Sequence, residues 1–391
     1  MSLAARLLPA IAETLPAAAA AAPLTLVKLA PEQWDAAIAG FDDVCQEQLM
    51  VFAAARWPGV VQEPLLFMEG DEVAGGCLVM VQPLPLRLGA IAVAKWAPML
   101  ARANRPDALL LYSRMIELMV AEYAERRGMM LSVLPRAALG VRNGQYEHLT
   151  GRGFKPGATL LFPDRYIVNL RLGDDELRRS FHQKWRYHLN KADKAGLSFE
   201  RAEPSRRSEF DALYAQMVDR KKFPDHSAYD TVPALMEIAE PALRPELFIA
   251  RRKSAEGLGE VVAGAIIFKA GERAVYLYGA TNAPALELRA GYFLHWHIIR
   301  WLRDNTPARW YDLGGTDGFQ GLHQFKKGMV GERGIIAPVP PVANYAAHFW
   351  PRLIGEAAFA GREIAHRLGR QLDRLRPDRA NPDQRREDGH E

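Results

Sequence analysis

Two short strings in the second half of the chain carry side chains that can stabilise charge. In the first, Lys326 stands between Phe325 and Lys327, and its ammonium could hold a phosphate or a developing oxyanion. Phe325 offers an adjacent flat surface for a base or an apolar group. In the second, Tyr276 and Tyr278 alternate on an expected strand, so we expect both hydroxyls to face one cleft. A surface position for Lys326 and core packing for the tyrosines are the alternatives.

A third candidate is Arg186, which lies in a basic segment directly after Trp185. A guanidinium presents a planar fork that can hold a carboxylate or a phosphate through two hydrogen bonds. Apolar residues at every fourth position predict a helix over 174–195, with Asp174 as its N-cap and Gly196 after its end. The basic face of that helix is either a binding surface or a solvated surface.

Several common catalytic motifs are absent from the sequence. It has no GxSxG elbow, no GxxxxGK(S/T) phosphate loop, no HExxH and no Cys/His cluster, so we expect no metal site. The two cysteines, Cys45 and Cys77, lack CxxC spacing, which favours a reducing compartment over a disulfide framework. His295 and His297 flank Trp296 but lie on different faces of an expected helix, so we expect them to be ordinary helix residues.

Length and composition indicate a globular chain of two domains. The 391 residues exceed the usual size of one domain, and 49% hydrophobic residues with 25% charged residues support a large core. The net charge of +4 is too small to indicate a nucleic-acid partner by itself. Charged residues and prolines interrupt every apolar stretch before the ~20 residues that span a bilayer, so we expect no transmembrane helix.

A strand pattern recurs about half a chain apart. The string 73–80 resembles 262–268, and a β-rich run precedes each of them. Each half continues with a helical pattern, over 107–127 and 289–304, and then with a short β-like segment. The shared order predicts two α/β domains of like topology, although chance similarity between α/β chains is the alternative.

We therefore expect five segments along the chain. They are a flexible leader over 1–23, an N-terminal domain over 24–170, a basic interdomain helix over 171–200, a C-terminal domain over 201–345, and a C-terminal helix with a disordered basic tail over 346–391. The leader is rich in alanine, and a signal peptide is the alternative there. The basic part of the last segment could lie on anionic lipid or RNA, or it forms a frayed terminal helix.

Four strings resemble motifs of the FemAB family of peptidoglycan-bridge aminoacyltransferases, in the order of that family. The segment 184–196 looks like the RxxIxKAxKxG helix, and 276–281 is similar to the YLYGSS strand. The string 325–329 is similar to the FKKGF signature, and 310–315 resembles the strand that leads into it. The matches span about residues 150–335, which makes the resemblance specific at the level of the superfamily.

The resemblance implies a fold, an activity and a set of site residues. Family members pair two GNAT-like domains and transfer an amino acid from aminoacyl-tRNA to an amino group of a peptidoglycan precursor. We accordingly expect an acyltransferase with tandem mixed α/β sheets, an aminoacyl-tRNA donor, an amine acceptor, no bound cofactor, and a location in the cytoplasm or at the inner face of the membrane. Amide formation from an activated ester needs a group that holds negative charge but no covalent enzyme intermediate. The implied catalytic residue is Lys326, and the implied substrate-binding residues are Arg186, Tyr276, Tyr278, Phe325 and Lys327.

Two features leave the donor and the acceptor open. The string 288–292, at an expected helix start, resembles the pyrophosphate loop of CoA-dependent GNAT enzymes but has one of its two glycines. An N-acyltransferase that uses acyl-CoA is therefore the alternative function. The chain also lacks a heptad-rich arm and has Arg56-Trp57-Pro58 where some family members carry Trp-x-Lys. A non-enzymatic partner in envelope assembly, with the same fold, is the third alternative.

Overall fold

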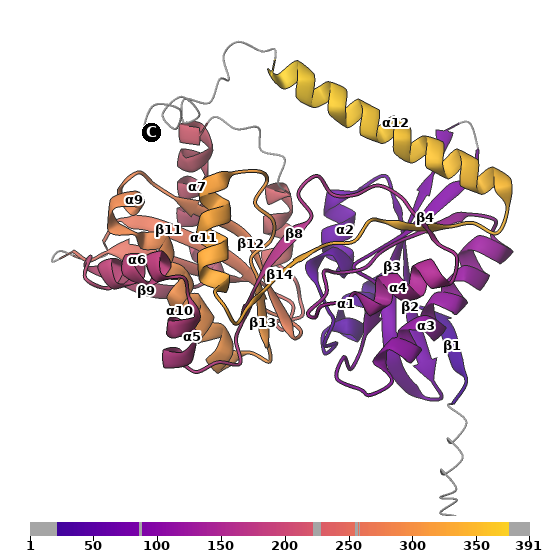
Figure 1. The fold of residues 1–391 in the computed structure, drawn as a ribbon, viewed down its shortest axis with the longest axis horizontal. Helices are drawn as coiled ribbons and strands as arrows, with labels where there is room; N and C mark the ends of the chain where they lie inside the picture. Colours follow the sequence, from indigo (N-terminus) through magenta and orange to yellow (C-terminus); the bar gives the residue numbers. More distant parts are fainter. Residues whose placement is uncertain (1–21, 86–87, 222–227, 255–256, 258, 375–391) are drawn as a thin grey trace, which may run out of the picture.

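Two lobes lie side by side, each formed around one β-sheet (Figure 1). The computed structural model describes residues 22–85, 88–221, 228–254, 257 and 259–374, with the backbone alone for 362–374. The expected leader, except for residues 22 and 23, and the expected tail after 374 lie outside this description.

The first sheet is made by the N-terminal half of the chain and one late strand. Its order is β1-β2-β3-β4-β6-β15-β7, and β5 pairs with β3. Its pairs are antiparallel except for β4 and β6, which are parallel. The bounds are β1 Leu24–Lys28, β2 Val61–Glu69, β3 Glu72–Pro83, β4 Ala90–Lys95, β5 Met99–Leu100, β6 Met130–Leu134, β7 Lys155–Pro156 and β15 Ala343–Tyr345.

The second sheet has the order β14-β8-β13-β12-β11-β10-β9. It is likewise antiparallel except for one pair, β12 and β13. The bounds are β8 Asp164–Asn169, β9 Leu197–Ala202, β10 Glu246–Arg252, β11 Val261–Phe268, β12 Arg273–Thr281, β13 Trp310–Asp312 and β14 Ile335–Pro338.

Each sheet contains one parallel pair of strands, and this shared feature shows that the two sheets are built alike. Parallel neighbours need a crossover connection, which is usually a helix. In the first sheet α3 (Ala108–Met119) and a π-helical turn (Val120–Arg126) join β4 to β6, and in the second sheet α9 (Pro284–Leu288) and α10 (Ala290–Asn305) join β12 to β13. The predicted repetition of element order in two α/β halves is confirmed.

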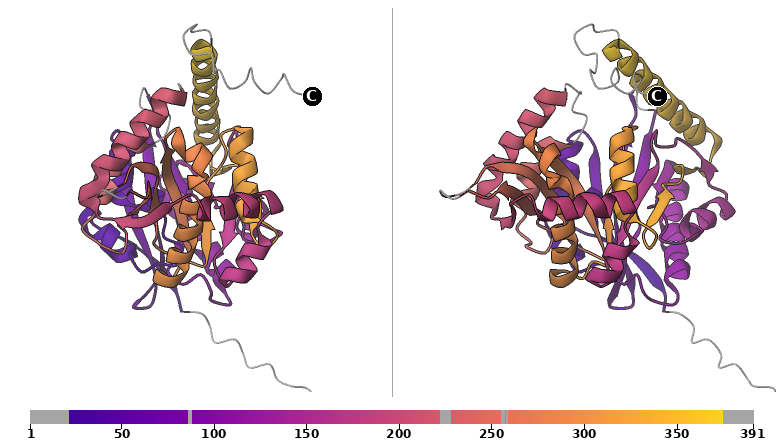
Figure 2. Two further views of the ribbon diagram at one scale, coloured as in Figure 1. Left: turned by 90° about the vertical axis from the view of Figure 1, so that its left-hand side faces the viewer. Right: turned by 60° about the vertical axis from the view of Figure 1, so that its left-hand side comes forward.

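The remaining helices lie around the two sheets, and α12 projects beyond them (Figure 2). They are α1 Pro31–Ile38, α2 Met50–Arg56, α4 Gly144–Gly151, α5 Asp174–Ser180, α6 Gln183–Asp193, α7 Arg207–Lys221, α8 Val232–Met236, α11 Gln320–Val330 and α12 Phe349–Arg374. Single 3₁₀ turns occur at Gln46–Gln48, Pro204–Arg206 and Tyr229–Thr231.

The expected single interdomain helix over 174–195 is wrong, because the chain forms two helices there, α5 and α6. The break is extended at Phe181, whose ring packs 4.4 Å from Trp185 and 6.0 Å from Trp296 on α10. The amide of His182 donates to the carbonyl of Gly328 on α11 at 3.0 Å. Contacts with α10 and α11 therefore hold Phe181 and His182 in a non-helical conformation. Both α5 and α6 pack on the core of the second sheet.

The two sheets do not follow the expected boundaries at residues 170 and 345. Strand β8 precedes the first boundary but pairs with β13 and β14 of the second sheet. Strand β15 precedes the second boundary but pairs with β6 and β7 of the first sheet. The chain thus crosses between the lobes twice, and Figure 1 shows both crossings between them.

A shared apolar cluster joins the lobes. Trp34, Val44 and Phe52 of the first lobe pack in one cluster with Leu235 and Phe268 of the second. Because burial of such side chains stabilises by roughly 1.5–3 kcal/mol each, we expect the two lobes to stay associated.

Helix α12 follows β15 and runs along the outer edge of the first lobe (Figure 1). Its first turns expose three large apolar side chains, Phe349, Trp350 and Leu353. Within the described ranges, none of the helices is apolar over enough residues to cross a membrane, as expected.

Candidate active site

Lys326 is buried on α11, so a surface position for it is wrong. Its Nζ donates to the carbonyls of Leu313 at 2.6 Å and Gly315 at 2.5 Å, directly after β13 ends. The ammonium also lies 5.7 Å from the ring centroid of Tyr276. Burial, and then the nearby charge of Arg165, lowers the pKa of Lys326 to about 8. An ammonium has three donors, and these two carbonyls take two of them.

His295 lies beside this ammonium and was missed by the sequence analysis. It is buried on α10, its Nδ1 is 3.1 Å from the Tyr311 hydroxyl, and its ring is 4.9 Å from that of Tyr276. Burial, and then the charge of Lys326, lowers the pKa of His295 to about 3. The imidazole is therefore neutral. The sequence did contain one indication of this position. His295 follows Gly291 by four residues, so the two share one face of the helix, and in the structure both face Phe325.

Aromatic rings surround the first turn of α10. The Tyr292 ring lies 5.2 Å from Trp185, 4.9 Å from His188 and 4.9 Å from Phe325. Phe325 thus belongs to this group, whereas its neighbour Lys326 points to the end of β13. Three nitrogens around these rings are buried and have no hydrogen-bond partner in the described part of the chain: Trp185 Nε1, His188 Nδ1 and Arg289 Nε.

The start of α10 adds the backbone donors of a helix N-terminus. Arg289 caps it with a left-handed φ of 55°, which sharply separates α10 from α9. Free N–H groups and the helix dipole make such a start a site for anions. The unpartnered nitrogens and this helix start lie together, which is an arrangement that suits an anionic group.

The expectation that Tyr276 and Tyr278 face one side is wrong, because β12 contains a bulge. Ile266 and Ile267 of β11 pair with Tyr278 and Tyr276, so Leu277 has no partner residue. One extra residue inverts the alternation of side chains. Tyr276 consequently packs against the core below α10, while Tyr278 packs in the cluster of α7 on the other face.

Arg186 does not point at the ring group, which is the set of aromatic side chains around the first turn of α10. Its Nη1 donates to the backbone carbonyls of Arg179 and Phe181 at the end of α5. These carbonyls have no intrahelical partner, so the guanidinium closes the α5–α6 junction. Lys327, in contrast, is exposed, because consecutive helix residues lie about 100° apart.

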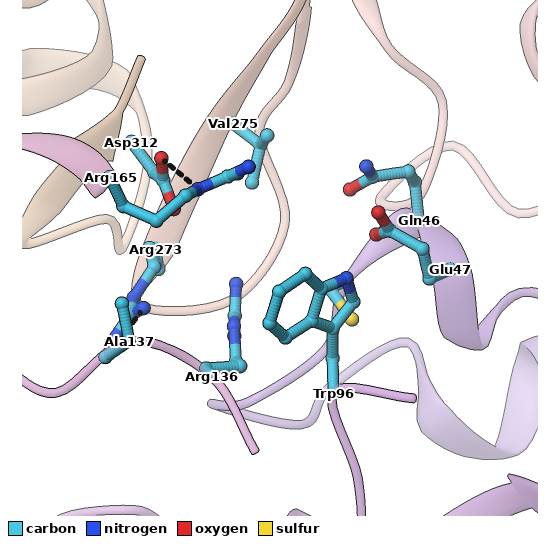
Figure 3. Close-up of a pocket in the computed structure, with 10 residues that line it drawn as sticks. Gln46, Glu47, Trp96, Arg136, Ala137, Arg165, Arg273, Val275 and Asp312 are labelled. Carbon is cyan, nitrogen blue, oxygen red and sulfur yellow. Dashed lines mark hydrogen bonds and ion pairs between the residues drawn. The ribbon is translucent and has the colours of Figure 1, made fainter. Parts of the chain in front are cut away.

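A group of arginines between the lobes is a second feature that the sequence analysis missed. Arg165 on β8 forms an ion pair with Asp312 at 3.1 Å, and Arg136 and Arg273 lie nearby (Figure 3). Asp312 also accepts from the amide of Gly314 at 2.9 Å, next to the carbonyls that hold Lys326. These residues are far apart in the sequence; the pairing of β8, β12 and β13 and the contact between the lobes bring them together.

A family model matches part of the second lobe. Residues 179–327 match the model of the acetyltransferase (GNAT) domain. This part of the chain is thus similar to GNAT acetyltransferase domains. It contains Lys326, His295 and the ring group at the start of α10. No curated protein matches the chain in sequence.

Solved structures extend the similarity to both lobes. FemX is 17% identical with a TM-score of 0.65, over 82% of this chain and 97% of FemX. L-PGS from Bacillus licheniformis is 11% identical with a TM-score of 0.50, over 84% of this chain and 96% of that chain. The protein therefore has the tandem GNAT fold of FemX, and the predicted fold class is confirmed.

Proposed function

We propose that this protein transfers an aminoacyl group from aminoacyl-tRNA to an amino group of a peptide acceptor of the peptidoglycan-precursor kind. The observation that supports this most is the ammonium of Lys326, which two backbone carbonyls hold at the end of β13 with one donor free. The acceptor amine attacks the ester carbonyl, and the carbonyl oxygen becomes negative in the tetrahedral intermediate. A charge held in advance stabilises that oxygen. The ribose oxygen then leaves and takes up the proton that the amine loses.

The surroundings of α10 support an RNA donor. The ring group offers flat surfaces on which a terminal base of the tRNA stacks, and the unpartnered nitrogens of Trp185, His188 and Arg289 offer polar contacts. Exposed lysines on the neighbouring helices supply phosphate contacts. These are Lys184, Lys191 and Lys327.

Acyl-CoA is the second candidate donor, and the helix start itself favours it. Gly291 stands in the first turn of α10 without a side chain, and a Cβ there would come no closer than 3.8 Å to Phe325. A pyrophosphate fits such a start. The acceptor in that case is a small amine or an envelope precursor.

The exposed residues of α12 support a place at the inner face of the membrane. Phe349, Trp350 and Leu353 are between 45% and 69% exposed, which is unusual for side chains of this size on one helix face. An amphipathic helix of this kind lies in the lipid interface. An acceptor carried by a membrane lipid would then meet the catalytic lobe.

One experiment separates these candidates. Purified protein is incubated with charged tRNAs or with acyl-CoAs, each with amine acceptors, and amide products are identified by mass spectrometry. We expect product from charged tRNA. Product from acyl-CoA alone would replace the aminoacyltransferase function by the N-acyltransferase function, and no product from either donor would contradict both.

A further inference from the structure

A cavity of about 240 Å³ lies between the two lobes. Most of its wall comes from the first lobe, and Arg273 at the start of β12 contributes from the second. The polar and aromatic residues that line it are Asp43, Trp96, Arg136, Arg142, Asn143 and Arg273. Arginines thus outnumber carboxylates among the lining residues by three to one.

Two of these arginines lack a charged partner. Arg273 is 8% exposed, and its Nη1 donates to the carbonyl of Ala137 at 3.1 Å. Arg136 donates to the backbone carbonyl of Asp43 at 3.3 Å. Neither guanidinium forms an ion pair with a carboxylate of the described residues, whereas Arg142 is paired with Glu147 at the surface.

Asp43 and Asp312 offset part of the charge of this pair, since each carboxylate interacts electrostatically with both arginines. Asp312 is engaged by Arg165, and Asp43 accepts from the amide of Leu100 at 3.1 Å. Burial, and then the charge of Arg136, lowers the pKa of Arg273 to about 9. A bound anion would offset the repulsion that remains between the two guanidinium groups.

A smaller cavity of about 10 Å³ adjoins this one. Trp96, Arg136 and Arg273 line both, and Figure 3 shows the side chains that converge on the smaller cavity. Gln46 also lines it, and its Oε1 is buried without a hydrogen-bond partner among the described residues. This acceptor atom and the Glu47 carboxylate therefore line the smaller cavity together with the guanidinium groups, an arrangement that suits a ligand with a donor group beside its negative charge.

The cavity and Lys326 lie on opposite faces of the second sheet. Ala274 and Tyr311 belong to the core below α10. Arg273 and Asp312, each one residue away along the strand, line the cavity on the opposite face of the sheet. A ligand in the cavity therefore touches both lobes and lies across β13 from the ring group.

We propose that the interlobe cavity is a binding site for a small organic molecule that carries a phosphate or a carboxylate group, with Arg136 and Arg273 as its anion ligands. Guanidinium groups bind both anions through paired hydrogen bonds. The two arginines come from different lobes, so the ligand also holds the lobes together. The site does not depend on which donor or acceptor the catalytic lobe uses.

Calorimetric titration of the purified full-length protein tests this site. The ligands are inorganic phosphate and succinate, each at an ionic strength matched with chloride. We expect at least one of them to bind, and the two titrations distinguish phosphate from carboxylate as the favoured group. Arg136→Gln should weaken that binding roughly 10-fold or more, the size of a lost charge-assisted contact.

Arg126→Gln is the matched control, because Arg126 is 66% exposed and pairs with Glu122 on the outer surface. Arg273 is buried, so the variant at this position is Arg273→Lys, which keeps the positive charge but loses the paired hydrogen bonds of the guanidinium. Circular dichroism checks that this variant is folded. Absence of binding of both ligands by the wild type would overturn the site. Equal binding by the wild type and Arg136→Gln would overturn it as well.

Discussion

At the scale of single residues, two neighbouring lysines have different environments. Lys326 is buried with its Nζ held by carbonyls of the chain after β13, whereas Lys327 is exposed on the same helix. The sequence analysis treated both as contacts for an anionic donor. The structure separates them into a fixed internal charge and a surface charge, and each has its own measurable effect.

We predict that Lys326→Ala lowers the rate of transfer by on the order of 10²-fold or more, as when a donor that stabilises an oxyanion is removed. Lys327→Ala is the matched control and should leave kcat near the wild-type value. It should instead reduce the salt dependence of tRNA binding by about one phosphate contact. Transfer by Lys326→Ala at the wild-type rate would contradict the role of its ammonium.

The depressed pKa of Lys326 predicts a pH dependence. Burial lowers this pKa from its ordinary value of 10.5 to about 8, so the positive charge disappears as the pH rises through about 8. The rate advantage of the wild type over Lys326→Gln should therefore be constant below pH ~7 and shrink above pH ~8. Taking the ratio of the two rates removes the ionisation of the acceptor amine, which is common to both proteins. An advantage that stays constant to pH 10 would show that the charge is not needed.

At the scale of elements, the bulge in β12 decides which tyrosine lies near Lys326. Tyr276 lies near Lys326 and His295, and a Cβ on Gly279 would lie 1.6 Å from its hydroxyl oxygen. Tyr278 lies against Tyr229, with ring centroids 5.3 Å apart. Alternation along a regular strand would have put both tyrosines on one face, and the extra residue prevents this.

We predict that Tyr276→Phe reduces kcat, because it removes a hydroxyl on the side of Lys326, while Tyr278→Phe leaves kcat unchanged. Both substitutions keep the ring and should cost no more than about 1–2 kcal/mol of stability. Steady-state kinetics and chemical denaturation of the two variants check this. Equal losses of kcat in both variants would contradict the division of the tyrosines by the bulge.

At the scale of the whole molecule, the chain crosses between the lobes twice and continues from β15 into α12. The crossings through β8 and β15 tie each lobe to a strand from the other part of the chain. Helix α12 then presents Phe349, Trp350 and Leu353 to solvent. The catalytic lobe and this apolar face are thus parts of one body.

We predict that the protein binds vesicles of anionic lipid through α12. Replacing Phe349, Trp350 and Leu353 together by serine removes most of the exposed apolar surface of this face, and each buried side chain contributes roughly 1.5–3 kcal/mol. Sedimentation with vesicles should show at least ~10-fold weaker binding of the variant. Transfer to a water-soluble acceptor is the control and should be unchanged, and equal sedimentation of both proteins would contradict membrane binding.

The order of elements, the repeat and the resemblance of 310–315 and 325–329 to family strings were accessible from the sequence, because local periodicity and short strings carry them. The roles of Arg186 and Tyr278 were not. A side chain's direction depends on helix breaks and bulges that contacts with α10, α11 and β11 impose. The arginines between the lobes were also out of reach, since Arg136, Arg165 and Arg273 are scattered along the sequence. Pairing of β13 with β8 and β12 brings Arg165 and Arg273 together, and contact between the lobes adds Arg136. Both are decided by burial in the folded protein rather than by any local pattern.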